Sequence, residues 1–370
     1  MRRVSAVGLM SGTSLDGIDV ALINTDGREI GRLGPSFYRP YSEAERALLR
    51  RALKEAAALD DRASRPGALE AAEVLVTRAH AEAVEAFLVA SGVDSGDVAI
   101  IGFHGQTVLH RPERQLTVQI GDGAALAQRL RLPVVYDFRA ADVTAGGQGA
   151  PLVPIFHQAL AAGLDRPRPL AVLNIGGVAN VTLVGVGTDP IACDVGPGNA
   201  LLDDFMRART GAPLDRDGAQ AAQGRVDTDF IARALSDPFF ARPCPKSLDR
   251  NAFAALVADL SSYSVADGAA TLTTFSVAAV ARMVAHFPAP PRSWVVAGGG
   301  THNPTLMRLL TERLAPARVE TADTVGWSAD ALEAQAFAYL AVRTLNGLPI
   351  TFPTTTGVPA PTCGGVLVTP

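Results

Sequence analysis

The 370-residue sequence predicts an α/β protein built from two similar lobes. Three observations lead to this prediction. Short apolar runs typical of strands alternate with longer amphipathic runs typical of helices in both halves of the chain. Glycine-rich polar turns follow several of the apolar runs in each half. The length corresponds to about two domains.

In the first half, a strand hairpin opens the chain and leads through a polar turn into a helix. Ser42 and Glu45 have the spacing of a capping box at the start of that helix. A longer amphipathic helix is expected at residues 68–91, where Gly92 would end it. Further short strands are expected at residues 98–103, 116–120 and 132–137.

The second half repeats the order of strand, glycine turn and strand that opens the chain. We expect an N-terminal lobe of residues 1–130 and a C-terminal lobe of residues 131–370, divided near a Gly-rich segment. The last long helix is apolar around much of its circumference, which predicts burial. Expected later elements are two helices between 217 and 260, helices at 267–287 and 327–346, and a tail at 348–370 that is a loop or a last strand.

Composition limits the possible partners and the cellular compartment. Hydrophobic residues make up 48% and charged residues 19% of the chain, and the net charge is −4, so nucleic acid and anionic membranes are not expected as partners. The start lacks the pattern of a signal peptide, and no apolar run reaches the roughly 18 residues of a spanning helix. We therefore expect a soluble cytoplasmic protein. The three cysteines predict neither a metal box nor an evident disulfide set.

Four glycine turns each follow an apolar strand. Glycines let a backbone approach a ligand closely, and amide N–H groups in such turns can bind anions. Where a helix starts after the turn, its N-terminus adds partial positive charge. One such turn alone is better explained as simply tight, but four of them in both halves favour phosphate binding. The turns lie at residues 12–19, 176–180, 196–199 and 298–303.

Several familiar motifs are absent from the sequence. There is no G-x-x-x-x-G-K-[ST], so the chain is not a P-loop NTPase. No G-x-G-x-x-G follows a strand, which weakens a dinucleotide interpretation, and no G-x-S-x-G nucleophile elbow is present. There is also no H-E-x-x-H zinc motif.

Seven sequence blocks, in order, resemble the anhydro-N-acetylmuramic acid kinase family. They span residues 8 to 307, and the helix "DALEAQAFAYLA" extends the likeness. The resemblance implies two lobes of the ribonuclease-H-like, actin-like ATPase type, with a cleft that closes over ATP. It further implies that ATP, water and 1,6-anhydro-N-acetylmuramic acid become N-acetylmuramic acid 6-phosphate and ADP in peptidoglycan recycling. The blocks are "GLMSGTSLDGID", "FHGQT", "QIGD", "DFRAADVTAGGQGAPLVP", "NIGGVANVT", "DVGPGNALLD" and "AGGGTHNPTLM".

The resemblance implies three ATP-binding turns. Mg²⁺ follows from phosphoryl transfer, because a metal offsets phosphate charge. Its ligands stay open, since Met10 and Asn174 stand where the wider superfamily has Asp, and Asp16, Asp19 and Asp194 are candidates. The implied ATP-binding residues are Gly12, Thr13, Ser14, Leu15, Asp16, Gly17, Ile18 and Asp19 in the first turn, Asn174, Gly176 and Gly177 in the second, and Gly298, Gly299 and Gly300 near the adenosine.

Asp194 is the candidate general base. It follows an apolar run and precedes the turn Val195–Gly198, and a carboxylate at a strand end beside a glycine turn suits proton abstraction. The resemblance implies that it takes a proton from the water that opens the anhydro bridge. The alternative is that Asp194 forms the turn or caps the following helix.

Four further residues are candidates for binding the sugar. Glu333 lies in an apolar helix and either contacts sugar hydroxyls or pairs with a core arginine. His104 and Gln106 follow a strand and line the cleft, although His104 fits a satisfied buried histidine equally well. Arg139 is a candidate for a bidentate contact with the lactyl carboxylate. Lys246 lies in a loop that departs from the family pattern, so its role stays open.

Two rival functions remain at this point. One is a kinase for another amino sugar, and the other is a non-catalytic ATP-binding regulator on the same fold. The resemblance alone implies a homodimer. Release of ADP with and without the anhydro sugar separates the three possibilities.

Overall fold

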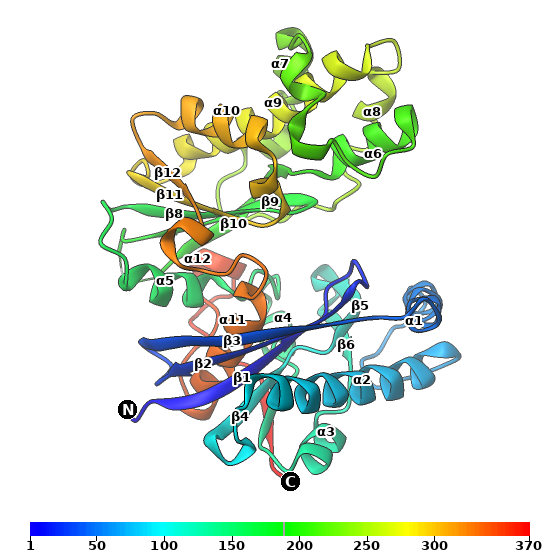
Figure 1. Ribbon diagram of the computed structural model, residues 1–370, viewed down its shortest axis with the longest axis vertical. Helices are drawn as coiled ribbons and strands as arrows, with labels where there is room; N and C mark the ends of the chain where they lie inside the picture. Colours follow the sequence, from blue (N-terminus) through cyan, green and yellow to red (C-terminus); the bar gives the residue numbers. More distant parts are fainter. Residues whose placement is uncertain (188) are drawn as a thin grey trace. The chain divides into compact units, whose positions relative to one another are not determined.

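The computed structural model describes residues 1–187 and 189–370, and the chain forms two compact units (Figure 1). Unit 1 comprises Met1–Gly163 and Asp330–Pro370, and unit 2 comprises Leu164–Ala329. The expected boundary between residues 130 and 131 therefore falls inside unit 1. The C-terminal segment differs from the expectation as well, because its long helix packs on the sheet of unit 1 and not with the second half of the chain.

Unit 1 combines a mixed sheet with helices on both faces and a separate hairpin. Its strands are β1 (Val4–Met10), β2 (Gly17–Thr25), β3 (Ile30–Pro40), β4 (Val98–Phe103), β5 (Gln106–Arg111), β6 (Leu116–Ile120), β7 (Val134–Tyr136) and β13 (Val366–Val368). Its helices are α1 (Glu43–Ala56), α2 (Ala68–Ser91), α3 (Gly123–Leu130), α4 (Ala140–Thr144), α5 (Pro154–Ala162), α11 (Leu332–Leu345) and α12 (Pro353–Thr356), with 3₁₀ turns η1 (Ser95–Asp97) and η2 (Pro112–Arg114).

Unit 2 also combines one mixed sheet with helices. Its strands are β8 (Leu170–Ile175), β9 (Val178–Val184), β10 (Ile191–Pro197), β11 (Ser293–Ala297) and β12 (Arg318–Thr321). Its helices are α6 (Ala200–Thr210), α7 (Thr228–Ala234), α8 (Leu256–Asp259), α9 (Val265–Met283) and α10 (Pro304–Leu314), with 3₁₀ turns η3 (Arg216–Gly218), η4 (Ala221–Gln223), η5 (Pro238–Ala241), η6 (Val284–His286), η7 (Gly299–His302) and η8 (Asp323–Val325).

The two sheets share one topology. In unit 1 the order is β3-β2-β1-β4-β7, with β13 added beside β7, and in unit 2 it is β10-β9-β8-β11-β12. In each, three consecutive strands run antiparallel, and the remaining two run parallel to the first strand. This is the strand order of the ribonuclease-H-like fold, so the prediction of an α/β protein with two similar lobes is confirmed.

Helix α11 fixes the core of unit 1 by lying against β1, β2 and β4 (Figure 1). Two glycines make this close approach possible. A Cβ atom on Gly8 would overlap the backbone of Ala334, and one on Gly102 would overlap the carbonyl of Phe337. The opposite face of the sheet packs against α2, which in turn packs against α1. Helix α11 starts five residues later than expected from the sequence, and its burial is confirmed.

Local signals near the N-terminus are confirmed. Ser42 and Glu45 form the predicted capping box at α1, and α2 ends at Gly92 in the left-handed conformation. The sequence analysis missed the strands β3, β5 and β12. Strand β3 is an edge strand whose residues are half-buried or exposed, so it lacks the apolar alternation that marks a strand.

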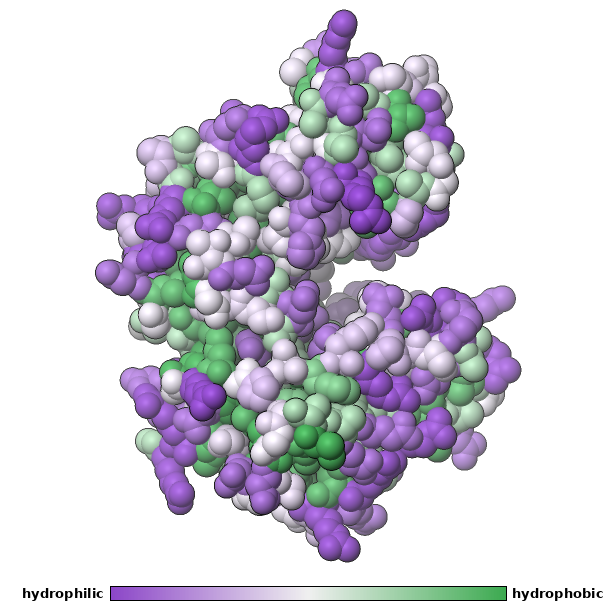
Figure 2. All heavy atoms as spheres, in the orientation of Figure 1, coloured by the Kyte–Doolittle hydropathy of each residue, from purple (hydrophilic) through white to green (hydrophobic). Residues whose placement is uncertain are grey.

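One helix in the described part of the chain, Val265–His286, is long and apolar enough to cross a membrane by length and composition. The sequence analysis predicted a helix at residues 267–287 and did not count it as a possible membrane span, because Asp267 and Arg282 interrupt the apolar run. In the structure 67% of its most apolar window is buried, and it packs on β10, α6 and α10, which marks a core helix. Figure 2 shows hydrophilic residues spread over the visible face of both units.

The packing of α11 predicts that Gly102→Ala destabilises the protein by about 1–3 kcal/mol, because the added methyl group overlaps the backbone of the helix. Gly163→Ala is the matched control, since a methyl group there would lie 3.5 Å from the nearest atom, the Leu160 carbonyl oxygen. Urea denaturation of both variants gives the free energies of unfolding. Equal values for the two would contradict this account of the interface.

Candidate active site

Hydrogen bonds to the Gly12 carbonyl hold the first turn, between β1 and β2, while several of its residues are exposed to solvent. The amide of Leu15 donates to the Gly12 carbonyl at 3.2 Å, and the buried side chain of Gln106 donates to the same carbonyl at 3.2 Å. Leu15, Gly17 and Ile18 are buried, so the side chains of Leu15 and Ile18 are not available to a ligand. Thr13, Ser14 and Asp16 are exposed.

A cavity of about 450 Å³ adjoins this turn. Strands β1, β4 and β7 are parallel, so the residues that follow them meet at one edge of the sheet. The structure thus brings His104 and Arg139 together, and Glu333 reaches the same cavity from α11. Gln106 lies behind the turn. Sequence reasoning did not single out five members of the lining as site residues, Met10, Ser11, Thr107, His110 and Ala150, and two of these, Thr107 and His110, belong to the unrecognised strand β5. The cavity is lined by Met10, Ser11, Gly12, Thr13, Ser14, His104, Thr107, His110, Arg139, Ala150 and Glu333.

His104 holds Arg139 in place. The Nε–H group of Arg139 donates to Nε2 of His104 at 3.1 Å, and Nη1 of Arg139 donates to the Gly149 carbonyl at 2.7 Å. Nε2 can accept only if the ring is neutral, so the proton of His104 lies on Nδ1 and is donated to the Gly105 carbonyl at 2.8 Å. Burial and the charge of Arg139 hold the pKa of His104 well below its usual value.

Arg139 and Glu333 face the same cavity without forming an ion pair within the described residues. Burial lowers the pKa of Arg139 to about 10, and the charges of Glu333 and Asp142 oppose that effect. The pKa of Glu333 is raised because the surrounding protein displaces water, and the charge of Arg139 opposes this rise. Each group therefore keeps donors or acceptors for a ligand, which favours the first of the two interpretations of Glu333.

Carboxylates gather beside the first turn. Asp19 lies at the start of β2, opposite Met10 of β1. Burial, followed by the nearby charges of Glu333, Asp330 and Asp16, raises the pKa of Asp19 to about 6. This mutual repulsion would be relieved by a cation, and carboxylate oxygen is the ligand that Mg²⁺ prefers. The described residues contain no group of three or more His, Cys, Asp or Glu arranged to hold a metal by themselves.

In unit 2 the three remaining glycine turns lie together. Carbonyl oxygens of Gly176 and Gly177 accept the amides of Gly198, Asn199 and Ala200 at 2.8 to 3.2 Å, which joins the second turn to the start of α6. The side-chain amide of Asn199 donates to the Ile175 carbonyl at 3.3 Å. A Cβ atom on Gly298 would lie 2.5 Å from the side-chain oxygen of Asn174.

The glycines in these turns serve two different purposes. Gly17, Gly198, Gly298 and Gly300 are required by packing, because a Cβ atom there would crowd neighbouring atoms of the same unit. Gly196 is crowded too, because a Cβ atom there would lie 3.0 Å from the Cβ of Ala279. A Cβ atom at the four remaining positions would meet nothing closer than 3.5 Å, and none of them has a positive φ, so neither packing nor conformation requires glycine there. Glycine at such a position lets a ligand approach the backbone closely. The four positions are Gly12, Gly176, Gly177 and Gly299.

Asp194 is held at two points in β10. Its amide donates to the Lys246 carbonyl at 3.0 Å, and its Oδ2 accepts the amide of Leu248 at 2.7 Å. Burial raises the pKa of Asp194 to about 6, and the Leu248 hydrogen bond and the charge of Lys246 reduce this rise. A carboxylate with a raised pKa, whose second oxygen accepts no hydrogen bond from the described residues, suits a general base near neutral pH. Asp194 does not cap the following helix, because it lies within β10 and the N-cap residue of α6 is Asn199.

The loop that follows Cys244 is anchored in the core. Nζ of the buried Lys246 donates to the Phe239 carbonyl at 3.0 Å and lies 4.4 Å from the centre of the Phe239 ring. The charge of Lys246 is therefore directed into the protein. Cys244 and Cys193 form a disulfide across 51 residues of sequence, which the cysteine spacing did not reveal.

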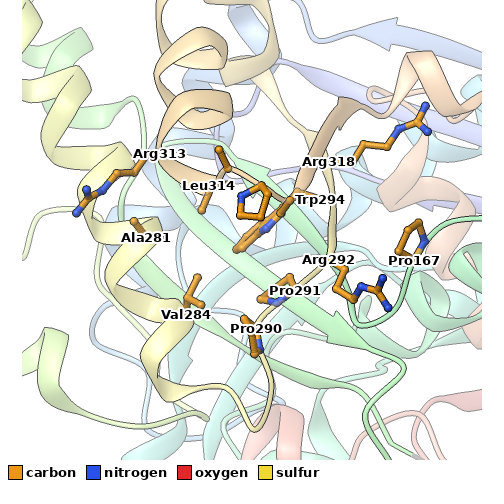
Figure 3. Close-up of a pocket in the computed structure, with 13 residues that line it drawn as sticks. Pro167, Ala281, Val284, Pro290, Pro291, Arg292, Trp294, Arg313, Leu314 and Arg318 are labelled. Carbon is orange, nitrogen blue, oxygen red and sulfur yellow. The ribbon is translucent and has the colours of Figure 1, made fainter.

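A larger hollow of about 660 Å³ lies elsewhere in unit 2 (Figure 3). Its lining includes Pro167, Arg292 and Arg318, which precede or begin β8, β11 and β12. The hollow therefore lies at the amino ends of these strands, opposite the glycine turns at their carboxyl ends. None of the residues that the sequence predicted for a site lines it.

Comparison with known families gives one full-length match. The model of the family described as anhydro-N-acetylmuramic acid kinase matches residues 4–370. A protein of that name from Rhodopseudomonas palustris is 61% identical over 368 residues, which covers 99% of this chain and 100% of the relative. Another from Nitrobacter winogradskyi is 59% identical over 367 residues, with 99% and 100% coverage.

Solved structures show a more distant likeness. Component A of (R)-2-hydroxyglutaryl-CoA dehydratase from Acidaminococcus fermentans is 13% identical, with a TM-score of 0.49 and coverage of 93% of this chain and 99% of that chain. A ROK family glucokinase from Streptomyces griseus, in complex with glucose and AMPPNP, is 16% identical, with a TM-score of 0.40 and coverage of 91% and 99%.

The hydrogen bonds of His104 predict that its ring stays neutral, with the proton on Nδ1, as the pH falls from 8 to 6. Protonation would place a second positive charge against Arg139 inside the protein. Nitrogen-15 chemical shifts of the histidine rings measure this directly. A His104 ring that is fully protonated by pH 6 would contradict the assigned network.

Proposed function

Because the chain belongs to the anhydro-N-acetylmuramic acid kinase family, we propose that it is an ATP-dependent kinase that opens 1,6-anhydro-N-acetylmuramic acid by hydrolysis and phosphorylates O6. The products are N-acetylmuramic acid 6-phosphate and ADP, and the reaction serves peptidoglycan recycling. The observation that carries the proposal is the full-length match, with relatives about 60% identical over 99% of the chain.

In the proposed reaction, Asp194 takes a proton from water as the water oxygen bonds to the anomeric carbon. The bond between that carbon and O6 breaks, and O6 attacks the γ-phosphorus of ATP. The bond from that phosphorus to the bridging oxygen breaks, and ADP leaves. Oδ2 of Asp194 is held by the Leu248 amide, so the other oxygen accepts the proton, and a general base must be positioned within hydrogen-bond reach of that proton.

Unit 1 supplies groups for both substrates in this proposal. The amides of the first turn and the hydroxyls of Thr13 and Ser14 bind phosphate oxygens of ATP. Arg139, oriented by His104, binds the lactyl carboxylate, and Glu333 accepts hydrogen bonds from sugar hydroxyls. Bound Mg²⁺ would neutralise phosphate charge, and Asp19 and Asp16 are the residues that would hold it.

The remaining features of the proposal concern the state of the protein in the cell. We place it in the cytoplasm, where ATP is available, and expect a homodimer. Its partners are the small-molecule substrates, and neither nucleic acid nor a membrane is expected, since the net charge is −4.

A coupled assay of ADP release tests the function. Wild-type protein should release ADP only when the anhydro sugar is present, and Asp194→Asn should lower kcat by about 10²–10⁴-fold, because the base can no longer accept a proton. Binding of ATP should remain. Asp227→Asn is a matched control, since Asp227 caps α7 in the same unit and asparagine can also cap a helix.

The outcome of the same assay separates the rival functions. ADP release without any sugar would favour an ATP-binding regulator. Release that tracks another amino sugar would favour a different kinase. Near-normal kcat in Asp194→Asn would show that Asp194 is not the base.

The raised pKa of Asp194 predicts the pH dependence of turnover. A base must be deprotonated, so kcat/KM for the anhydro sugar should be constant above about pH 7 and fall as the pH drops through the pKa of about 6. Asp19, whose pKa is also about 6, is tested separately: Asp19→Asn should retain the same decline toward acid pH. A kcat/KM that is flat down to pH 5 would contradict the assignment of Asp194.

A further inference from the structure

The glycines at the second turn leave space beside a positively charged side chain. A methyl group added at Gly177 would lie 3.5 Å from Nε and 3.7 Å from Cδ of Arg250, and 3.6 Å from the Cβ of Ala200. Arg250 follows the loop that binds Asp194, and about half of its side chain is exposed. The side chain of Arg250 therefore lies within contact distance of the exposed backbone at Gly177.

The backbone amides next to the second turn are used in hydrogen bonds within the protein, so positive charge for binding an anion there has to come from another group. The amides of Gly198, Asn199 and Ala200, which begin the helix after the turn, donate to the carbonyls of Gly176 and Gly177. These donors are consequently not free to bind an anion, in contrast to the general expectation for a helix that follows a glycine turn. An arginine in contact with the turn can replace them, because its planar group carries several donors and a permanent charge.

We propose that Arg250 binds a phosphate group of ATP at the Gly176–Gly177 turn. This inference rests on the proposed function, in which ATP is a substrate. The geometry favours a phosphate because Gly177 is exposed and lies within contact distance of Arg250, and because the only ion pair of Arg250 among the described residues is a single contact of 3.2 Å with Asp204. A guanidinium group with unused donors suits the oxygens of a phosphate.

The chain offers a matched control for Arg250. Arg207 pairs with the same oxygen of Asp204, also at 3.2 Å, and its side chain is similarly exposed, at 60% against 51%. Arg207 lies in the last turn of α6 and is not among the atoms that contact Gly177. Loss of charge, loss of the Asp204 pair and general surface effects are therefore common to both substitutions.

The test compares Arg250→Ala, Arg250→Lys and Arg207→Ala. Arg250→Ala should lower kcat/KM for ATP by about 10- to 100-fold, and Arg250→Lys by less, because lysine keeps the charge and loses the planar fork. Arg207→Ala should stay within about twofold of wild type. Equilibrium binding should show weaker ATP binding by Arg250→Ala and unchanged adenosine binding, since only the phosphates reach Arg250.

The outcomes distinguish this inference from the proposed function. Equal effects of Arg250→Ala and Arg207→Ala, or equal weakening of ATP and adenosine, would overturn the role of Arg250. Wild-type protein that binds ATP and does not turn over the anhydro sugar would overturn the proposed function, while ATP binding by the variants would still test Arg250.

Discussion

The glycine turns depend on one constraint: the backbone must be held from the protein side while its other side stays open. In unit 1 the side-chain amide of Gln106 binds the Gly12 carbonyl, and in unit 2 the amides of Gly198 and Asn199 bind Gly177 and Gly176. Hydrogen bonds to backbone carbonyls thus fix both turns. Each turn joins the first two strands of its sheet, and the two sheets have the same strand order, so the same arrangement occurs in both units.

The same principle governs Asp194. A carboxylate that is removed from water without a partner destabilises the folded protein, and one that is fully paired is a poor base. Asp194 is neither unpaired nor fully paired, since one of its oxygens accepts a hydrogen bond from the amide of Leu248 and its pKa is raised to about 6. The burial of Lys246 against Phe239 stabilises the loop that provides this amide. Lys246 thus helps to fix the position of Asp194.

Much of this could be predicted from the sequence, since strand–turn–strand patterns and the apolar helix α11 leave strong local signals. The unit boundary could not, because the return of α11 to β1 and β4 is a long-range contact. Strand β3 was not predicted because it has no apolar face. Leu248 and Arg250 were missed because their roles depend on a backbone amide and a spatial neighbour, neither of which the residue type reveals.

Arg139 and Glu333 line one cavity, and no ion pair among the described residues joins them, which bears on the kind of ligand that the cavity can bind. Two opposite charges facing one cavity would gain most by pairing directly, and a direct pair would leave few donors or acceptors for a ligand. The described structure keeps Arg139 turned toward His104 and the Gly149 carbonyl, and no ion pair among the described residues joins it to Glu333. A ligand with a carboxylate near one group and hydroxyls near the other satisfies both, and the proposed acidic sugar has this combination.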